Sequence, residues 1–227
     1  MRHGDEQMRA LRSRARPLTA LLLSAALGGC GNVTAGGVTG EAEVYMSGDA
    51  ERGGTSTAAI LSSPKGGGPS APGASTAGVI VGAGLEGDVQ VTASLYLRRA
   101  GAPLIDLTPA GAVTVTLDPG GAQEPLVADE VVPGGSYQGI RIIFTDVVAE
   151  VTGGLEIGGV PFTGAVRVDL AGDGLVVDRT LAITVGDDQP VALLVDLGSD
   201  VWLNLLNPLS RTVAAADFAN AVEVTLR

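Results

Sequence analysis

The stretch VQVTASLYLR, residues 89–98, alternates apolar and polar side chains more regularly than any other part of the chain. Val, Ala and Leu occupy its odd positions, whereas Gln, Thr, Ser, Tyr and Arg occupy the even ones. Successive side chains of a β-strand point to opposite faces of the sheet, so this period predicts a strand with one buried and one solvated face.

Short apolar or alternating segments recur on both sides of this stretch, and Gly, Pro and Asp fill the turns between them. No segment has a sustained helical period, and many short strands with such turns are typical of two packed sheets. The sequence therefore predicts an all-β fold, an antiparallel β-sandwich, with one short helix at residues 210–220. Further strands are expected at residues 39–46, 113–117, 140–144, 147–151, 166–170, 175–177, 181–185, 191–197 and 221–226.

The chain begins with the features of an export signal. Four arginines between residues 9 and 16 precede an apolar run at residues 18–27. This run fits the ~7–15 apolar residues of a signal peptide and is shorter than the ~20 that a membrane-spanning helix needs. The sequence Leu27-Gly28-Gly29-Cys30 resembles a bacterial lipobox, which implies cleavage before Cys30 and lipid (palmitate among its acyl chains) on the cysteine. Met1 and Met8 are both candidate start residues.

The predicted organisation has five parts. A signal peptide at residues 1–29 precedes a lipidated tether at 30–37 and a first strand at 38–46. A flexible Gly/Ser/Pro-rich linker or insertion at 47–78 then leads to the β-sandwich domain at 79–227. Because a long loop without secondary structure is uncommon inside a compact domain, we expect the first strand to pack loosely or to lie at a sheet edge.

The residue types left after such cleavage limit the chemistry of the mature chain. Loss of five basic and two acidic residues from totals of 14 and 25 leaves nine and 23, a net charge of −14. Nucleic-acid binding depends on Lys and Arg at phosphates, so no nucleic-acid partner is expected. The only histidine, His3, lies in the signal peptide, and Cys30 and Lys65 are the only cysteine and lysine. These counts exclude a Ser-His-Asp or Cys-His nucleophile, a His/Cys zinc site and a disulfide, and we expect no cofactor.

Two glycine-rich motifs resemble functional signatures but fit strands and turns better. Residues 82–87 match G-x-G-x-x-G, yet a two-residue period follows them instead of the helix that a dinucleotide site needs. Residues 134–139 resemble a nucleophile elbow around Ser136, but the second glycine comes one residue late and no histidine is available to activate the serine. We interpret the second motif as a turn that leads into a strand.

Aspartates gather around turns in the C-terminal part of the chain. Calcium takes oxygen ligands from such loops, which makes these side chains candidates for a metal site. Their spacing matches no EF-hand loop, and Asp is a common turn residue because its side chain bonds nearby backbone amides. We therefore expect plain turns, although a pair of carboxylates could also serve a glycoside hydrolase. The candidates are Asp169, Asp173, Asp178, Asp187 and Asp188.

Arg141 interrupts an apolar strand and is a candidate for ligand contact. An arginine in this position either receives an anion or carboxylate, or lays its stem on the sheet and pairs with an acid of the protein. We favour the second interpretation, with an acid such as Glu150 or Asp169 as the partner.

Three aromatic residues are the remaining candidates for ligand contact. Tyr45 and Tyr96 fall on the polar faces of their strands, and Trp202 lies in an alternating segment near the C-terminus. Exposed rings could stack on sugars, whereas the alternative is cross-strand packing or closure of one end of the core.

Two segments, GEAEVYMSGDA at residues 40–50 and VPGGSYQGIRIIF at 132–144, together resemble a family of exported bacterial and archaeal β-sandwich domains of unknown function, which are often carried on lipoproteins. Residues 40–50 (GEAEVYMSGDA) are similar to the family's opening strand and its Thr-Asp-Ala-Pro turn, although Ser47, Gly48 and the residue after Ala50 depart from that turn. The resemblance covers most of residues 40–202 and implies a β-sandwich without an established activity. Residues 132–144 (VPGGSYQGIRIIF) match the family's Gly-x-Tyr and Ile-Arg at Gly135, Tyr137, Ile140 and Arg141.

These observations together favour a lipid-anchored protein of the cell envelope that acts as a non-catalytic interaction or structural module. Its expected partners are the membrane, through the lipid, and an envelope protein or glycan. A carbohydrate-binding module is the alternative, and a carboxylate-based hydrolase is the third hypothesis. Gly31 follows Cys30 where aspartate would be the usual signal for retention in the inner membrane, so we expect the outer membrane.

Overall fold

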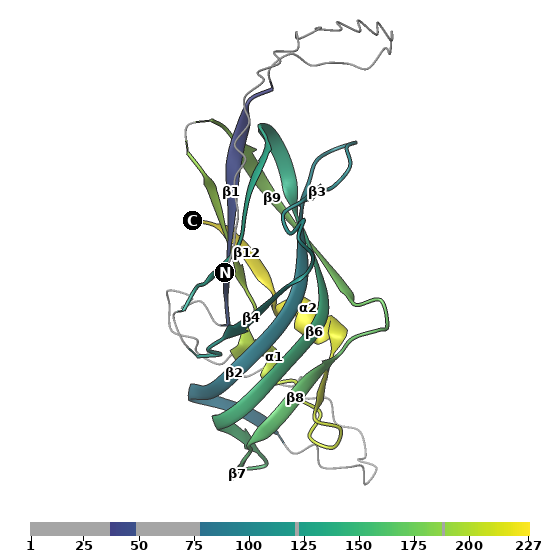
Figure 1. The fold of residues 1–227 in the computed structure, drawn as a ribbon. Helices are drawn as coiled ribbons and strands as arrows, with labels where there is room; N and C mark the ends of the chain where they lie inside the picture. The colour runs from purple at the N-terminus through teal and green to yellow at the C-terminus, as the bar shows by residue number, and fades with distance from the viewer. Residues whose placement is uncertain (1–36, 49–77, 121–122, 188) are drawn as a thin grey trace, which may run out of the picture. The chain divides into compact units, whose positions relative to one another are not determined.

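Two long strands form the centre of the larger sheet, sheet B, in the computed structural model (Figure 1). The structure describes residues 37–48, 78–120, 123–187 and 189–227. Strands β2 (Val79–Arg98) and β6 (Gly135–Ile157) pair antiparallel along most of their length. The predicted signal peptide, Cys30 and nearly all of the predicted linker lie outside the described residues.

Shorter strands extend sheet B on both sides of this central pair. Strands β3 (Ile105–Asp106) and β4 (Val113–Leu117) pair with the edge of β2 that faces away from β6. Strands β7 (Val160–Pro161), β8 (Gly164–Asp169) and β9 (Leu175–Val185) pair with β6. Strand β11 (Thr212–Ala214) runs parallel to β8 at the outer side of the sheet.

The smaller sheet, sheet A, is built around the first strand. Its order is β12 (Glu223–Leu226), β10 (Val191–Asp196), β1 (Thr39–Ser47) and β5 (Leu126–Pro133). Strand β1 is therefore an inner strand, parallel to β10 and antiparallel to β5. The prediction of a loose or edge strand is wrong, because both backbone edges of β1 are paired and its apolar side chains fill the core. Ala42, Val44 and Met46 are at most 1% exposed.

The two packed sheets confirm the predicted all-β sandwich, although the pairing is mixed and not antiparallel throughout. Two pairs are parallel, β1 with β10 and β11 with β8. The members of each parallel pair are far apart in sequence, so no hairpin fixes their direction. Alternation within a strand sets which face is buried but carries no information about the direction of its neighbour.

Bulges and special glycines make the strands longer than the sequence pattern indicates. The segments 140–144 and 147–151 belong to the single strand β6, because Thr145 is an extra residue between the partners of Thr92 and Ala93. Such a bulge shifts the apolar period without ending the strand. Residues 82–87 likewise lie within β2, where Gly87 has φ 138° and packs against the carbonyl oxygen of Glu150.

Helix α2 (Ala215–Ala221) occupies only the second half of the predicted helix, since residues 212–214 form β11. Arg179 in β9 donates hydrogen bonds to the carbonyl oxygens of Val222 (2.8 Å) and Ala219, which satisfies backbone groups left free at the end of the helix. Helix α1 (Ser199–Leu203) was not expected, because one turn is too short to show a helical period.

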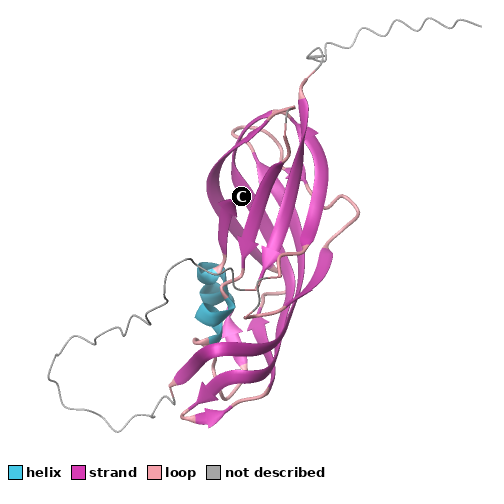
Figure 2. Ribbon diagram, turned by 90° about the vertical axis from the view of Figure 1, so that its left-hand side faces the viewer, coloured by secondary structure: helices cyan, strands magenta, loops and turns pink. Residues whose placement is uncertain are grey.

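The two short helices lie beside the sheets (Figure 2). Three aromatic side chains join both helices to sheet B. The ring of Phe218 in α2 lies edge-on to Phe144 of β6, with centroids 5.0 Å apart, and edge-on to Trp202 of α1, at 5.6 Å. All three side chains are fully buried. Edge-to-face pairs add to the stabilisation that burial itself provides, so Phe218 is the central residue of this cluster.

Replacing Phe218 with Ala should lower the free energy of unfolding by about 3–5 kcal/mol, because it leaves a cavity between two aromatic partners. Leu209→Ala is the matched control, since Leu209 is 96% exposed and its truncation should change stability by less than about 0.5 kcal/mol. Denaturant unfolding of the two variants checks this prediction, and equal losses in both would contradict the described core.

Candidate functional site

A row of polar side chains crosses the outer face of sheet B. Asp106, Tyr96, Arg141 and Asp178 are successive register partners on β3, β2, β6 and β9. Their neighbours along the strands, such as Leu95, Ile140 and Val177, are buried in the core. The row therefore lies on the face turned away from the core, and we call it the polar row.

Arg141 and Asp178 form the strongest interaction of the polar row. The Nε and Nη2 atoms of Arg141 donate to the two carboxylate oxygens of Asp178 at 2.9 and 2.8 Å. The predicted pairing of Arg141 with an acid is confirmed, but the partner is neither Glu150 nor Asp169. The register of β6 against β9 decides the partner, and a single sequence does not give that register.

This ion pair keeps Asp178 in its charged form. The hydrogen bonds from Arg141 lower the pKa of Asp178, and the positive charge of Arg98 lowers it further, while partial burial opposes both. The same hydrogen bonds raise the pKa of Arg141. Asp178 is therefore an ionised structural acceptor and is unsuited to act as a general acid, which needs a raised pKa.

A shallow hollow lies beside the polar row, and we call it the Arg98 groove. It has a volume of 390 Å³ and is lined by Arg98, Tyr137, Gln138, Thr180, Leu181 and Ala182. Arg98, Gly139 and Thr180 are register partners on β2, β6 and β9, so a position without a side chain lies between two polar ones. Gly139 has φ 145°, and a Cβ atom there would lie 1.9 Å from the carbonyl oxygen of Arg179. The backbone geometry at this position therefore requires glycine.

Arg98 has hydrogen-bonding capacity to spare. Its Nη1 atom lies 3.7 Å from Asp178, and its side chain is 30% exposed. No hydrogen bond from Arg98 occurs within the described residues, although a guanidinium carries five N–H donors. At 3.7 Å the contact with Asp178 is an ion pair without a hydrogen bond, so the N–H donors of Arg98 are available to another acceptor.

The Gly-x-Tyr segment shapes one end of this groove. The hydroxyl of the buried Tyr137 donates to the carbonyl oxygen of Pro133, four residues earlier, and Arg99 lies over the Tyr137 ring at 5.7 Å. Burial raises the pKa of Tyr137, so the hydroxyl remains a donor at neutral pH. Gly135 has φ 131°, and a Cβ atom there would lie 2.7 Å from the Arg99 guanidinium. This segment therefore fixes where β6 begins.

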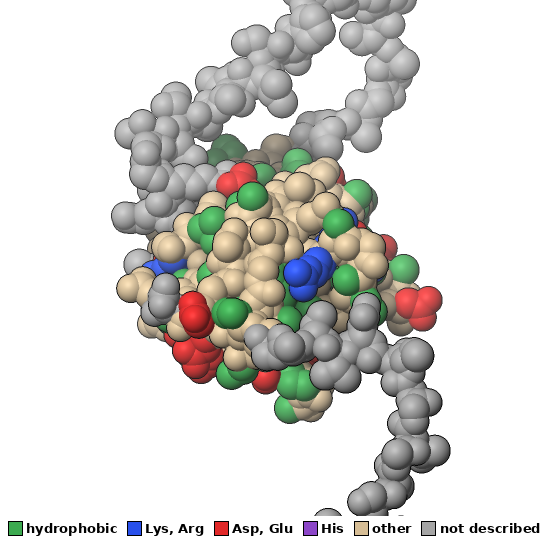
Figure 3. Space-filling view, turned by 90° about the horizontal axis from the view of Figure 1, so that it is seen from above, with side chains coloured by type: hydrophobic (Ala, Val, Ile, Leu, Met, Phe, Trp, Pro, Cys, Tyr) green, Lys and Arg blue, Asp and Glu red, His purple; other side chains and the backbone are tan. Residues whose placement is uncertain are grey.

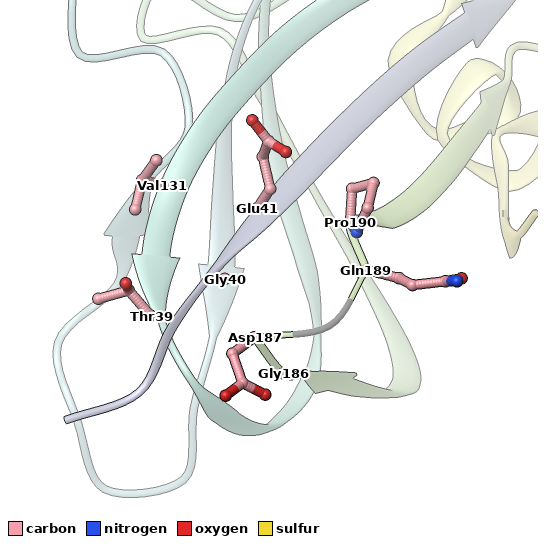
Figure 4. Close-up of a pocket in the computed structure, with 8 residues that line it drawn as sticks. All are labelled: Thr39, Gly40, Glu41, Val131, Gly186, Asp187, Gln189 and Pro190. Carbon is pink, nitrogen blue, oxygen red and sulfur yellow. The ribbon is translucent and has the colours of Figure 1, made fainter.

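A second hollow lies where β1 begins (Figure 4). It has a volume of 320 Å³. The carboxylates of Glu41 and Asp187 point in different directions and do not converge on one point (Figure 4). The described residues of the hollow therefore offer no ready set of ligands for a cation. Its lining residues are Thr39, Gly40, Glu41, Val131, Gly186, Asp187, Gln189 and Pro190.

The candidate calcium ligands are spread over different parts of the fold. Asp169 ends β8, and Asp173 lies in the turn closed by the hydrogen bond from Gly174 N to Ala171 O. Asp178 belongs to the polar row and Asp187 to the second hollow, while Asp188 lies outside the described residues. Within the part of the chain that the structure describes, no three His, Cys, Asp or Glu side chains are grouped so that they could hold a metal ion.

The three predicted aromatic contacts have different environments. Tyr45 donates to Glu43 at 2.9 Å, and Arg227 lies 4.7 Å from its ring centroid, on the outer face of sheet A. Trp202 is fully buried, so its assignment as a ligand contact is wrong: it lies on helix α1, which turns the ring into the core, and not on a strand. Tyr96 is partly exposed in the polar row.

The end of the molecule seen in Figure 3 has apolar side chains scattered among polar ones, with acidic side chains around them. A continuous apolar surface is the usual mark of a large protein interface. The described residues on that face do not form one.

Comparison of the chain with protein-family models, with curated proteins and with solved structures finds no match. Of the described helices, none has the length and apolar character needed to cross a membrane.

Sequence reasoning found Tyr96, Arg141 and Asp178 but missed Arg98, Gln138 and Thr180. Arg98 ends the regular alternating stretch and faces the same side as Tyr96, which was a usable signal. The other two become neighbours of Arg98 only through the pairing of β6 with β2 and β9.

Replacing Asp178 with Asn should lower stability at neutral pH, by less than Phe218→Ala, because it removes the charge that pairs with Arg141 and Arg98 at a half-exposed site. Since the folded-state pKa of Asp178 is lowered, its contribution is present above the unfolded value of about 3.9 and is lost as the pH falls through the folded value. Unfolding curves of the variant and the unmodified protein should therefore converge as the pH falls below the folded-state pKa of Asp178.

Asp146→Asn is the matched control, because the ion pair of Asp146 within the described residues is an exposed contact with Arg167 at 3.9 Å, so its replacement should change stability little. A difference for Asp178→Asn that is unchanged between neutral and acid pH would contradict the role given to this ion pair.

Proposed function

We propose that this chain is a lipid-anchored, non-catalytic binding module of the cell envelope. The observation that carries the proposal is the position of Cys30, which ends an apolar run and comes nine residues before Thr39, where β1 begins. At most about 3.6 Å per residue, these nine residues span about 30 Å. A lipid on Cys30 would therefore hold the domain close to a membrane surface.

The position of β1 within the domain supports anchoring through this end of the chain. Strand β1 is paired on both sides, so a tether that enters it is attached to the core of sheet A and not to a peripheral strand. Parting β1 from both neighbours would require the backbone hydrogen bonds on its two edges to break together. A pull on the lipid anchor would thus act on an inner strand of the folded domain.

The chemistry of the outer face of sheet B supports binding without catalysis. Asp178 is the acid beside the groove, and its hydrogen bonds with Arg141 favour its charged form. A glycoside hydrolase needs one carboxylic acid kept protonated by its surroundings. The ion pair creates the opposite situation, which makes a carboxylate-based hydrolase the weakest of the three hypotheses.

A carbohydrate-binding module is the second candidate. The observation that favours it is the partly exposed ring of Tyr96, which lies on the same face of β2 as the Arg98 groove. An aromatic face beside polar side chains suits a sugar ring, which has both apolar and hydroxyl-bearing surfaces.

Cys30→Ser should abolish acylation, because the thiol that would receive the lipid is removed. Expressed in a bacterium with two membranes, the unmodified protein should carry lipid on an N-terminal Cys30 and fractionate with the outer membrane. Mass spectrometry of the membrane-extracted protein measures both the new N-terminus and the attached lipid.

Gly31→Asp is the matched control, since it should keep the lipid and move the protein to the inner membrane. A mature N-terminus away from residue 30, without lipid, would overturn the anchoring proposal. So would membrane association that Cys30→Ser leaves unchanged.

A further inference from the structure

The Arg98 groove presents guanidinium N–H donors that make no hydrogen bond within the described residues. Two guanidinium groups, of Arg98 and Arg141, share the single carboxylate of Asp178. Asp106, the other acid of the polar row, accepts from the backbone N–H and the hydroxyl of Thr108 at 2.8 and 3.2 Å. Its carboxylate therefore stabilises the turn that follows β3. The free donors beside the groove therefore favour an anionic group.

A carboxylate fits these donors better than a neutral polar group. The planar fork of a guanidinium matches the two oxygens of a carboxylate, and such charge-assisted hydrogen bonds are stronger than neutral ones. Asp178 already shows this geometry with Arg141 in the neighbouring position. Arg98 would make the equivalent contact with a carboxylate brought by the ligand.

The rest of the groove suits a sugar more than a peptide. Peptides commonly add a strand to a free sheet edge, but the β6 strand beneath the groove is paired on both sides, with β2 and β9. Recognition must therefore come from side chains. The Gln138 amide and the Thr180 hydroxyl line the groove and form no hydrogen bonds within the described residues, so both can bond sugar hydroxyls.

We propose that the Arg98 groove binds a carboxylate-bearing sugar residue of an envelope glycan. Arg98 pairs with the carboxylate, Gln138 and Thr180 bond ring hydroxyls, and Tyr96 offers an aromatic face next to them. The absence of a side chain at Gly139 leaves room for the sugar between β2 and β9. This inference rests on the proposed function as a binding module and names the chemical class of its ligand.

Calorimetric titration of the full chain in detergent with a hexagalacturonate tests the proposal. Binding should be measurable, and the fully methyl-esterified oligosaccharide should bind at least about tenfold more weakly, since esterification removes the negative charges with which Arg98 would pair. Equal affinity for the ester would overturn the proposal. A glutamate-rich peptide that binds as tightly as the sugar would overturn it too, because the carboxylate alone would then suffice.

Arg98→Gln should weaken hexagalacturonate binding about tenfold or more, whereas Arg167→Gln should leave it unchanged. Arg167 is also an arginine of sheet B, but it is 64% exposed and lies opposite Val148, seven residues along β6 from Arg141. If Arg98→Gln does not fold, nuclear magnetic resonance of the unmodified protein replaces it. The Gln138 side-chain amide and the Arg98 Nε–H should then shift on titration, and shifts confined to other residues would overturn the proposal.

Chromatography of the oligosaccharide after the titration separates this inference from the proposed function. Bound and intact sugar supports both. Bound but shortened sugar would keep the groove as a carboxylate-sugar site and overturn the non-catalytic function. No binding by a protein that is lipidated at Cys30 would overturn the groove and leave the anchored module standing.

Discussion

The pairing of β1 on both of its edges is the constraint on which the rest of the fold depends. Strand β1 joins β5 on one side and β10 on the other, and without it sheet A would separate into a lone strand and the pair β10–β12. A two-stranded unit is marginal in water without further packing. The core facing sheet B would then lose the cover provided by Ala42, Val44 and Met46.

The register of the strands in sheet B decides which polar side chains lie next to one another on its outer face. Because β2 and β6 are long and paired through bulges, residues distant in sequence form rows across the sheet. One row pairs Arg141 with Asp178, and the next places a glycine between Arg98 and Thr180. Arg98 lies 3.7 Å from Asp178, so two arginines from adjacent rows face one aspartate. Backbone sterics fix the glycine at position 139, so the hollow is a consequence of how β6 meets β9.

The sequence was sufficient for the fold class but not for the arrangement. Alternation at 89–98 predicts a half-buried strand because side-chain direction is a local property. The inner position of β1, the parallel pairs and the partner of Arg141 depend on contacts between distant segments, which one sequence does not reveal. The prediction for Trp202 was wrong for a related reason. The residue lies in a single helical turn, where its side chain does not point in the direction that strand alternation predicts. Strand β5 was missed because its apolar pattern is irregular, with Val131 exposed.

Amide hydrogen exchange along β1 in the full chain tests this account most directly. An inner strand uses the N–H groups of consecutive residues, alternately toward its two neighbours, whereas an edge strand uses only every second one. Residues 42–45 pair with both β10 and β5, so all four of their amides should exchange as slowly as those of Ile140 and Ile142 in β6. Protection of alternate amides only, or exchange as fast as in the turn at Gly101, would contradict the central place of β1.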